Sequence, residues 1–290
     1  MSGRGGVITE LARAKVNLTL EVLGRRPDGY HELVSLVAFA GLGDRLELSP
    51  AGDWSLSCEG PAAKGIEGDN LAGQAAAAVR VAWPDAAMGH LHLVKSLPVA
   101  AGLGGGSADA AAALRALRRL NEGRAGAPDW LALARQLGAD VPVCFIGKLA
   151  VMRGLGERID AVNFNVALPA VLVNPGTPLA TARVFGDLAA QPLSGNAQLA
   201  GIPEIGDTAS LLAWILAGRN DLEAPALRLA PSVGRVRAAL QAQPDCRVAR
   251  LSGSGPTCFG LFETPQAARA AAEAIAREQP DWWVQATALG

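Results

Sequence analysis

Apolar and polar residues alternate along the chain from residue 12 to residue 22. A period of two predicts a half-buried strand with one apolar face and one polar face. The polar face carries Lys15 and Asn17, which lie two residues apart and therefore point the same way. Thr19 and Glu21 share this face and are expected to be exposed to solvent. The strand thus presents Lys15 and Asn17 on its polar face.

The same criteria predict the elements of the rest of the chain. Its closing order of helix, two strands, helix and strand is typical of a small ferredoxin-like α+β layer. We expect an N-terminal domain over 1–165 and a C-terminal domain over 166–290. Further strands are expected over 33–48 (with a break at 41–43), 90–97, 149–159 (a hairpin), 166–174, 247–251, 257–262 and 282–288. Helices are expected over 71–83, 107–120, 128–137, 181–188, 208–217, 231–243 and 264–278, with a polar loop at 194–208.

The composition is that of a folded globular chain, since 50% of the 290 residues are hydrophobic and 18% are charged. A formal net charge of −1 gives no electrostatic reason to expect nucleic acid or a membrane surface as a partner. No apolar run approaches the roughly 18 residues that span a bilayer, and the first residues lack the apolar core of a secretory signal. The four cysteines are scattered, which suggests neither a zinc site nor a disulfide framework. A reducing, cytoplasmic compartment is therefore expected.

A glycine-rich loop follows the expected strand at 90–97 and leads into an alanine-rich helix. It reads Pro-Val-Ala-Ala-Gly-Leu-Gly-Gly-Gly-Ser-Ala-Asp over residues 98–109. Glycines let a ligand approach backbone N–H groups closely, and a helix N-terminus favours phosphate. No lysine follows Gly106, which excludes a Walker A loop, and the chain continues as helix, which argues against a dinucleotide fingerprint. A phosphate-binding loop and a flexible loop capped by Ser107 both remain open.

Three segments together extend this interpretation. They are residues 14–32, which hold Ala-Lys-Val-Asn-Leu and Asp-Gly-Tyr-His-Glu, the glycine loop at 98–109, and Leu-Ser-Gly-Ser-Gly-Pro-Thr at 251–257. Their order and spacing resemble the GHMP superfamily of galactokinases, homoserine kinases, mevalonate kinases and phosphomevalonate kinases. With Gly-Ala-Asp-Val-Pro-Val at 138–143, the first segment is similar to the branch that acts on a cytidine-diphosphate-linked methylerythritol. The resemblance covers nearly the whole chain and thins between about residues 186 and 245.

The resemblance implies a two-domain α+β kinase. Its N-terminal domain would resemble the second domain of ribosomal protein S5, its C-terminal domain would be ferredoxin-like, and the active site would lie in the cleft between them. The enzyme would move the γ-phosphoryl group of ATP to the 2-hydroxyl of the cytidine-diphosphate methylerythritol, in the non-mevalonate route to isoprenoid precursors. Its partner would be this small molecule, with no nucleic acid and no membrane, and the chain would be a monomer or a homodimer.

The resemblance assigns the catalytic roles to Asp140 and Lys15. The aspartate of the family's Gly-Ala-Asp motif takes the proton of the acceptor hydroxyl, so Asp140 is the candidate general base and also part of the substrate site. Lys15 would orient Asp140, hold its pKa down, and polarise the acceptor hydroxyl or the transferring phosphate. Asn17 occupies a position that the family uses for substrate contact. The residues alone also allow an ordinary helix N-cap at Asp140 and a solvated strand lysine at Lys15.

The resemblance places the cytosine ring of the substrate against Tyr30, the only tyrosine of the chain. An aromatic face can stack on a base, and His31 would hydrogen-bond the base edge. Phe185 resembles the second aromatic wall of this pocket. A packing role is the alternative for Tyr30 and for Phe185, and a structural role is the alternative for His31.

The resemblance also implies a nucleotide site that uses Mg²⁺ between the β- and γ-phosphates. The protein ligands of the metal stay undefined, because the family commonly reads Gly-Gly-Gly-Ser-Ser where this chain has Ala108 after Ser107. Ser107 and Asp109 are the candidates, although Asp109 could instead stabilise the helix dipole. Asn70 could equally be a helix cap and Lys95 a surface charge, while Gly253 to Gly255 would support the loop or form a tight turn. The residues expected at the ATP site are Asn70, Leu71, Lys95, Pro98, Gly102, Leu103, Gly104, Gly105, Gly106 and Ser107.

Two other functions stay open at this point. A GHMP kinase of the homoserine or mevalonate type would have no use for a cytosine pocket, so Tyr30, His31 and Phe185 discriminate against it. A non-catalytic nucleotide sensor on the same fold would be favoured by the loss of Lys15 or Asp140, and both residues are present.

Overall fold

A computed structural model describes residues 6–63, 70–162, 165–193 and 205–290. The chain forms two compact units, each built from separate segments. Unit 1 comprises Met1–Ala14, Leu42–Val99 and Gly104–Gly147, and unit 2 comprises Lys15–Gly41, Ala100–Leu103 and Lys148–Gly290. This grouping differs from a single division at residue 165, because two long strands each supply residues to both units. As a boundary between family domains, residue 165 stays a prediction.

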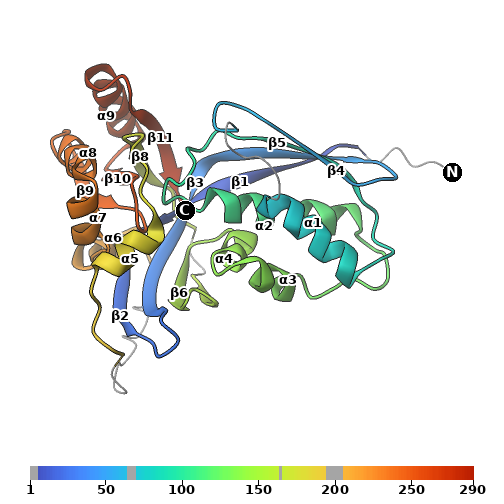
Figure 1. Ribbon diagram of the computed structural model, residues 1–290. Helices are drawn as coiled ribbons and strands as arrows, with labels where there is room; N and C mark the ends of the chain where they lie inside the picture. The colour runs from blue at the N-terminus through green and yellow to red at the C-terminus, as the bar shows by residue number, and fades with distance from the viewer. Residues whose placement is uncertain (1–5, 64–69, 163–164, 194–204) are drawn as a thin grey trace. The chain divides into compact units, whose positions relative to one another are not determined.

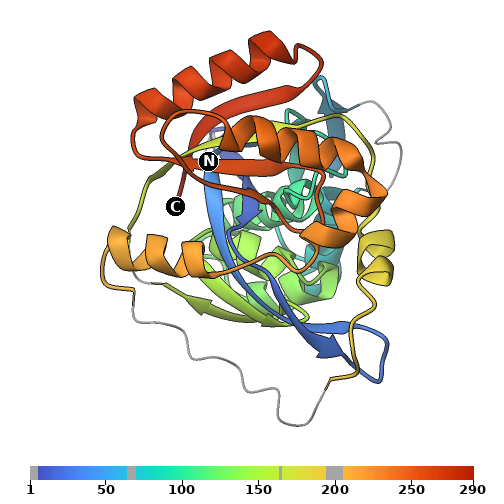
Figure 2. The same ribbon diagram turned by 90° about the vertical axis from the view of Figure 1, so that its left-hand side faces the viewer.

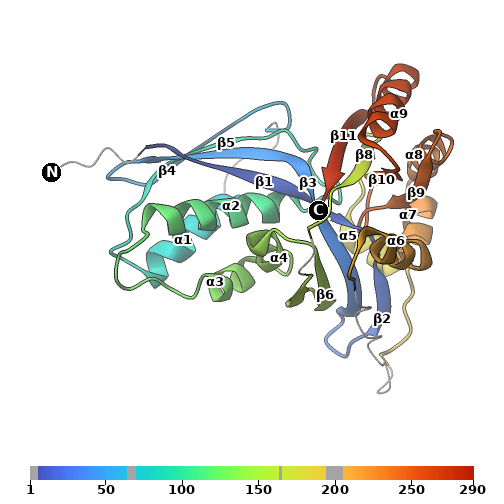
Figure 3. The same cartoon turned by 180° about the vertical axis from the view of Figure 1, so that it is seen from behind.

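Unit 1 is a sheet with four helices on one of its faces (Figure 1 and Figure 3). Its strands pair β3 with β5 in antiparallel fashion and β5 with β4 in parallel fashion. The alanine-rich faces of its first two helices are fully buried, and such small side chains let helices pack closely. The strands are β1 (Ile8–Asn17), β3 (His31–Pro50), β4 (Ser55–Glu59) and β5 (Gly89–Val94). The helices are α1 (Leu71–Ala82), α2 (Gly105–Leu120), α3 (Trp130–Leu137) and α4 (Val141–Ile146).

Strand β3 runs without interruption through the predicted break at residues 41–43. At Gly43 a Cβ atom would lie 2.1 Å from the carbonyl oxygen of Ala12 on β1. Glycine inside a strand often marks such a close approach of a second backbone, and here it admits the neighbouring strand. The prediction of a break was therefore wrong, because Gly43 admits the neighbouring strand and does not end β3.

The polar face of the first strand is buried, which corrects the expected half-exposed strand. Lys15, Asn17 and Thr19 are only 5%, 4% and 3% exposed. Thr19 does not face solvent, because its hydroxyl accepts a hydrogen bond from the backbone N–H of Leu36 at 3.2 Å. Glu21, which begins the short strand β2 (Glu21–Arg25), is half-buried. Burial of Lys15 also excludes the solvated lysine that the sequence left open.

Unit 2 contains the expected ferredoxin-like layer. Its four strands pair antiparallel in the order β11-β8-β10-β9, and two helices cover one face of them (Figure 2). In chain order these elements form the β-α-β-β-α-β unit of that fold. Its core holds Val171, Val173, Val233, Val236 and Ile275. The elements are β8 (Leu168–Asn174), α8 (Pro231–Gln241), β9 (Cys246–Leu251), β10 (Cys258–Phe262), α9 (Pro265–Glu278) and β11 (Trp283–Leu289).

Among the described residues, three further helices stand between β8 and α8, and a hairpin pairs with β3. The hairpin at 149–159 is confirmed as β6 (Ala150–Gly154) and β7 (Arg158–Ala161). Helices α5 (Thr181–Asp187) and α6 (Thr208–Ala217) were expected, whereas α7 (Glu223–Leu229) was not. The predicted loop at 194–208 lies outside the described residues as far as residue 204. In the described part of the chain, no helix combines the length and apolar character needed to cross a membrane.

Candidate active site

The glycine loop leads into α2 through a left-handed residue. Gly104 has φ +64° and stands at the N-cap of α2, where no side chain caps the helix. The first turn of a helix leaves N–H groups without partners inside the helix, and these groups favour an anion. Ser107 lies within the helix and does not cap it, so the capped-loop alternative was wrong. The start of α2 therefore has the form of a phosphate-binding site.

In unit 2 the segment 251–257 packs against the beginning of the loop. The hydroxyl of Ser252 donates to the carbonyl of Gly102 at 3.1 Å, and the N–H of Thr257 donates to the carbonyl of Ala101 at 3.2 Å. Gly102 itself has φ +74°, a conformation that favours glycine. This contact confirms the supporting position expected for Gly253 to Gly255, which also form a turn.

The substitution Gly102→Ala is expected to destabilise the protein by about 1–3 kcal/mol. The new Cβ would lie 2.7 Å from the Gly255 carbonyl oxygen and 2.8 Å from that of Ser252, so backbone would have to move. Urea unfolding measures the change. The matched control is Gly52→Ala, where nothing lies within 4 Å of the added atom, and its effect should stay within about 0.5 kcal/mol. Equal stability of the two variants would contradict the close packing of the loop on segment 251–257.

A buried charge cluster lies beside the start of α2 in unit 1. The ammonium group of Lys95 donates to Asp44 and, at 2.6 Å, to Asp109. A Cβ on Gly105 would lie 3.7 Å from Nζ of Lys95 and 3.8 Å from Oδ2 of Asp44. Asp44 also accepts hydrogen bonds from the backbone N–H groups of Ser96 and Leu97 at 2.5 and 2.8 Å. The cluster thus ties the end of β5 to α2 through Asp109, near the start of that helix, and Lys95 is not a surface charge.

Burial sets the protonation behaviour of this cluster. It raises the pKa of Asp109 to about 7, against the attraction of Lys95 and with the help of the Asp44 carboxylate. Burial alone lowers the pKa of Lys95, but the negative charges and hydrogen bonds of Asp109 and Asp44 outweigh it, so the pKa is raised. Oδ1 of Asp109 has no hydrogen-bond partner among the residues that the structure describes. Asp109 therefore has an oxygen available beside the helix start, and its other oxygen is held by Lys95.

Two more of the expected nucleotide residues lie in unit 1 next to the loop. Asn70 caps α1, and its side-chain oxygen accepts from the N–H of Gly73 at 2.9 Å. Leu71 begins that helix, and its Cδ1 would lie 3.5 Å from a Cβ on Gly106. The structure thus brings Leu71, Lys95 and the glycines at the start of α2 together. Pro98 is half-buried in the segment that leads to the loop.

Lys15 and Asn17 form a second polar cluster, in unit 2. The ammonium group of Lys15 donates to Oδ1 of Asn17 at 3.2 Å, and the backbone N–H of Lys15 donates to the carbonyl of Leu103 at 2.8 Å. The amide of Asn17 donates to the hydroxyl of Ser35 at 2.7 Å, and the backbone N–H of Asn17 donates to that of Ser252 at 3.2 Å. Both side chains are thereby held in fixed positions beside Leu103 of the glycine loop.

Asp140 stands at the N-cap position of α4 in unit 1 without capping that helix. Its backbone has φ −85° and ψ −15°, and its carboxylate accepts no hydrogen bond from the helix N–H groups. The preceding turn contains Gly138 at φ +153°, which ends α3. Asp140 thus occupies the N-cap position that the sequence allowed, but its carboxylate does not cap the helix.

The three residues expected at the cytosine ring belong to unit 2. The rings of His31 and Phe185 lie 5.0 Å apart between centroids and are tilted by 33°. Burial lowers the pKa of His31, and the positive charge of Arg25 lowers it further, so the imidazole is neutral at neutral pH and can donate or accept a hydrogen bond. Phe185 also packs against the core of unit 2, so its packing role is real. Tyr30 is 63% exposed.

The chain matches the family model for the N-terminal domain of GHMP kinases over residues 70–148 and the model for their C-terminal domain over 199–281. Because the models of both domains match, the chain is a GHMP kinase. It is 50% identical to the 4-diphosphocytidyl-2-C-methyl-D-erythritol kinase of Methylorubrum extorquens, over 98% of this chain and 99% of that protein, and 47% identical to the kinase of the same name from Rhodopseudomonas palustris, over 99% of both. The chain belongs to the 4-diphosphocytidyl-2-C-methyl-D-erythritol kinase family.

Solved structures agree with this family. A crystal structure of a 4-(cytidine 5'-diphospho)-2C-methyl-D-erythritol kinase is similar with a TM-score of 0.78 and 38% identity, over 98% of this chain and 99% of that one. The homoserine kinase of Cytophaga hutchinsonii is similar with a TM-score of 0.68 over 99% and 96% of the chains. At 17% identity, that second likeness shows the fold alone. As a member of its family, the chain is a phosphotransferase with an alcohol group as acceptor.

Proposed function

We propose that this protein transfers the γ-phosphoryl group of ATP to the 2-hydroxyl of 4-diphosphocytidyl-2-C-methyl-D-erythritol, in the non-mevalonate route to isoprenoid precursors. The observation that carries the proposal is the contact between the rings of His31 and Phe185. His31 directly follows Tyr30 in the sequence. These aromatic and imidazole groups suit a nucleobase, whereas homoserine and mevalonate carry none. The names of the relatives support the same substrate.

The phosphates of ATP bind to the glycine loop in this proposal. Gly104 stands at the N-cap of α2 with a left-handed backbone, and no side chain caps the N–H groups of the first turn. Lys95, paired with Asp44 and Asp109, lies beside this helix start, while Leu71 offers apolar surface beside Gly106 for the adenosine. Asn70, Pro98, Gly102, Leu103, Gly105 and Ser107 complete the proposed nucleotide site.

Mg²⁺ would arrive with ATP and neutralise charge between its β- and γ-phosphates. Within the described ranges, no three His, Cys, Asp or Glu side chains are grouped so that they could hold a metal ion by themselves. The residues fit a metal held mostly by phosphate oxygens, because Oδ1 of Asp109 is buried at the helix start without another partner in the described chain. Asp109 is therefore the proposed protein ligand, and Ser107 is the other candidate.

Asp140 acts as the general base and takes the proton of the 2-hydroxyl. Its carboxylate makes no capping hydrogen bond to the N–H groups of α4. Lys15, held by Asn17 on a buried strand, supplies a fixed positive charge that stabilises the negative charge of the transfer. Asn17 contacts the acceptor. The proposal places this work in the cytoplasm, which suits the four free cysteines.

The test of the function is phosphate transfer from ATP and Mg²⁺ to each of four acceptors in separate assays. The acceptors are the cytidine-diphosphate methylerythritol, free methylerythritol phosphate, homoserine and mevalonate. We expect transfer to the cytidine compound alone. Transfer to homoserine or mevalonate would overturn the substrate but keep the kinase chemistry, and ATP binding without any transfer would indicate a nucleotide sensor.

The substitution Tyr30→Ala should raise the Michaelis constant for the cytidine substrate by about tenfold, because a base that stacks on an aromatic ring gains about 1–3 kcal/mol. The Michaelis constant for ATP should stay within about twofold. Steady-state kinetics with each substrate varied in turn measures both values. Tyr30→Phe keeps the ring and serves as the control, with kinetics close to wild type. An equal loss of affinity for both substrates would point to a folding defect and would contradict the stacking role.

A further inference from the structure

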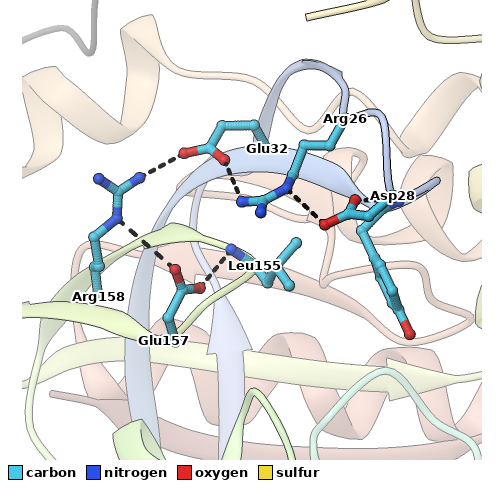
Figure 4. Close-up of polar contacts among 7 residues, drawn as sticks. Arg26, Asp28, Glu32, Leu155, Glu157 and Arg158 are labelled. Carbon is cyan, nitrogen blue, oxygen red and sulfur yellow. Dashed lines mark hydrogen bonds and ion pairs between the residues drawn. The ribbon is translucent and has the colours of Figure 1, made fainter.

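A chain of alternating charges connects the Tyr30 turn with the β6–β7 hairpin, both in unit 2 (Figure 4). Glu32 lies at its centre, where one carboxylate oxygen accepts from Arg26 at 3.1 Å and the other accepts from Arg158 at 2.5 Å. Arg158 also lies 3.9 Å from the carboxylate of Glu157 on the hairpin. Arg26 donates in turn to Asp28 at 3.2 Å. The chain of contacts therefore spans two parts of the molecule that are more than a hundred residues apart in sequence.

The far end of this chain holds the backbone of Tyr30. Oδ1 of Asp28 accepts from the N–H of Tyr30 at 3.1 Å, while its other oxygen binds Arg26. The N–H of Arg26 donates to the carbonyl of Tyr30 at 2.7 Å and closes the turn. Since Tyr30 is 63% exposed, side-chain packing contributes little to its position. Its orientation depends on this turn, and the turn is anchored through Arg26 to Glu32.

The other end of the chain fixes Arg158. Oε2 of Glu157 accepts from the backbone N–H of Leu155 at 2.6 Å, which holds that carboxylate at the tip of the hairpin. Hydrogen bonds between ionised partners are about twice as strong as neutral ones, and their strength rises when the site is shielded from water. Isolated exposed ion pairs contribute little, but Glu32 is only 9% exposed and both its oxygens are engaged. Glu32 is thus the one point through which the hairpin and the Tyr30 turn are held together by charge in the described chain.

We propose that Glu32 is a positioning residue that sets the specificity for the cytidine end of the substrate. Glu32 anchors the turn that carries Tyr30. It has no other role in the proposed reaction, because its side chain points to the two arginines, whereas its neighbour His31 contacts Phe185. Arg158 is its partner from the hairpin. This inference rests on the proposed function, because it concerns recognition of the cytosine ring.

The test uses Glu32→Gln and Arg158→Gln, each with kinetics for both substrates. Glutamine keeps the length of Glu32 but loses the charge, so the Michaelis constant for the cytidine compound should rise by about tenfold. Arg158→Gln, at an exposed position that tolerates change, should give a rise of about threefold. The turnover number and the Michaelis constant for ATP should stay within about twofold in both variants. The double variant should be no worse than Glu32→Gln alone, because the two residues act through one contact.

The control is Arg237→Gln, which removes an arginine of similar exposure that pairs with Glu223 elsewhere in unit 2. It should leave both Michaelis constants unchanged. The inference alone would be overturned if the wild type is active and both Glu32→Gln and Arg158→Gln keep the wild-type Michaelis constant for the cytidine substrate. The same holds for a loss shared equally between both substrates, which a merely structural role would produce. If Glu32→Gln fails to fold, the kinetics of Arg158→Gln decide the question. A wild-type protein that transfers no phosphate to the cytidine compound would overturn the inference and the proposed function together.

Discussion

Replacing Asp140 by asparagine is expected to lower the turnover number by about 10²–10⁴-fold, the range that general acid–base groups supply. Asparagine has the same shape but cannot accept the proton of the acceptor hydroxyl. Since the Asp140 side chain does not cap α4, the substitution should leave the helix intact. Nucleotide affinity should be close to wild type, because the proposed phosphate site is formed by the glycine loop.

Single-turnover phosphate transfer, with ATP affinity measured separately by calorimetry, tests this expectation. Asp129→Asn is the matched control, since Asp129 is also an aspartate at a helix N-cap of unit 1, where its carboxylate accepts from the N–H groups of Leu131 and Ala132. Asparagine caps helices as well as aspartate does, so this variant should be fully active. Turnover of Asp140→Asn within a few-fold of wild type would remove Asp140 from the mechanism.

The second large effect is expected at Lys95, where Lys95→Met should destabilise the protein by about 3–5 kcal/mol, because it leaves buried carboxylates without their cation. Methionine fills a similar volume but provides no charge. Asp44 is fully buried and Asp109 nearly so, and both depend on Lys95. Lys148→Met, at an exposed lysine, is the control and should change stability by no more than about 0.5 kcal/mol.

Urea unfolding at several pH values separates this explanation from a simple packing defect. The pKa of Asp109 in the folded wild type is about 7, above its ordinary value of 3.8. A raised carboxyl pKa means that the folded state binds the proton more tightly, so stability from this group is present at low pH and is lost as the pH rises toward 7. Without Lys95 this dependence should steepen, and the variant should approach wild-type stability on acidification. A loss that is independent of pH would contradict the role of the charge cluster.

The parts of the site that follow from local sequence were predictable. The glycine loop, the start of α1 at Asn70 and the ferredoxin-like order of elements each depend on residues close together in the chain. The contact between His31 and Phe185 could be expected only through the resemblance, since 154 positions separate the two residues in the sequence. Their proximity is a property of the tertiary structure, which no periodicity encodes.

The residues that sequence reasoning missed act through long-range contacts. Asp44 looks like any polar residue of a strand, and its part in the site is revealed by its contacts with Lys95, Ser96 and Leu97. Nothing in the sequence around Asp44 indicates burial, since Arg45 and Glu47 follow it in the same strand. Glu32 likewise carries no sequence signal, because Arg158 meets it from a separate hairpin.

Polar residues on a strand also mislead when both faces of the strand are covered. The alternation over 12–22 was real, but Lys15, Asn17 and Thr19 are buried with hydrogen-bond partners in place of solvent. Burying a charged or polar group is costly unless it is paired, so a covered polar face indicates a built network. This is why the first strand, which looked half-exposed, carries the buried polar cluster of Lys15 and Asn17.

The measurement that tests the central claim most directly is a competition in one reaction. Wild-type protein, ATP and Mg²⁺ are mixed with equal concentrations of the cytidine-diphosphate methylerythritol, methylerythritol phosphate, homoserine and mevalonate, and the products are separated by mass and examined by phosphorus NMR. The account predicts that only the cytidine compound gains a phosphoryl group, and that this group is attached to the oxygen of its 2-hydroxyl. Phosphorylation of any other acceptor, or attachment at another hydroxyl, would contradict it.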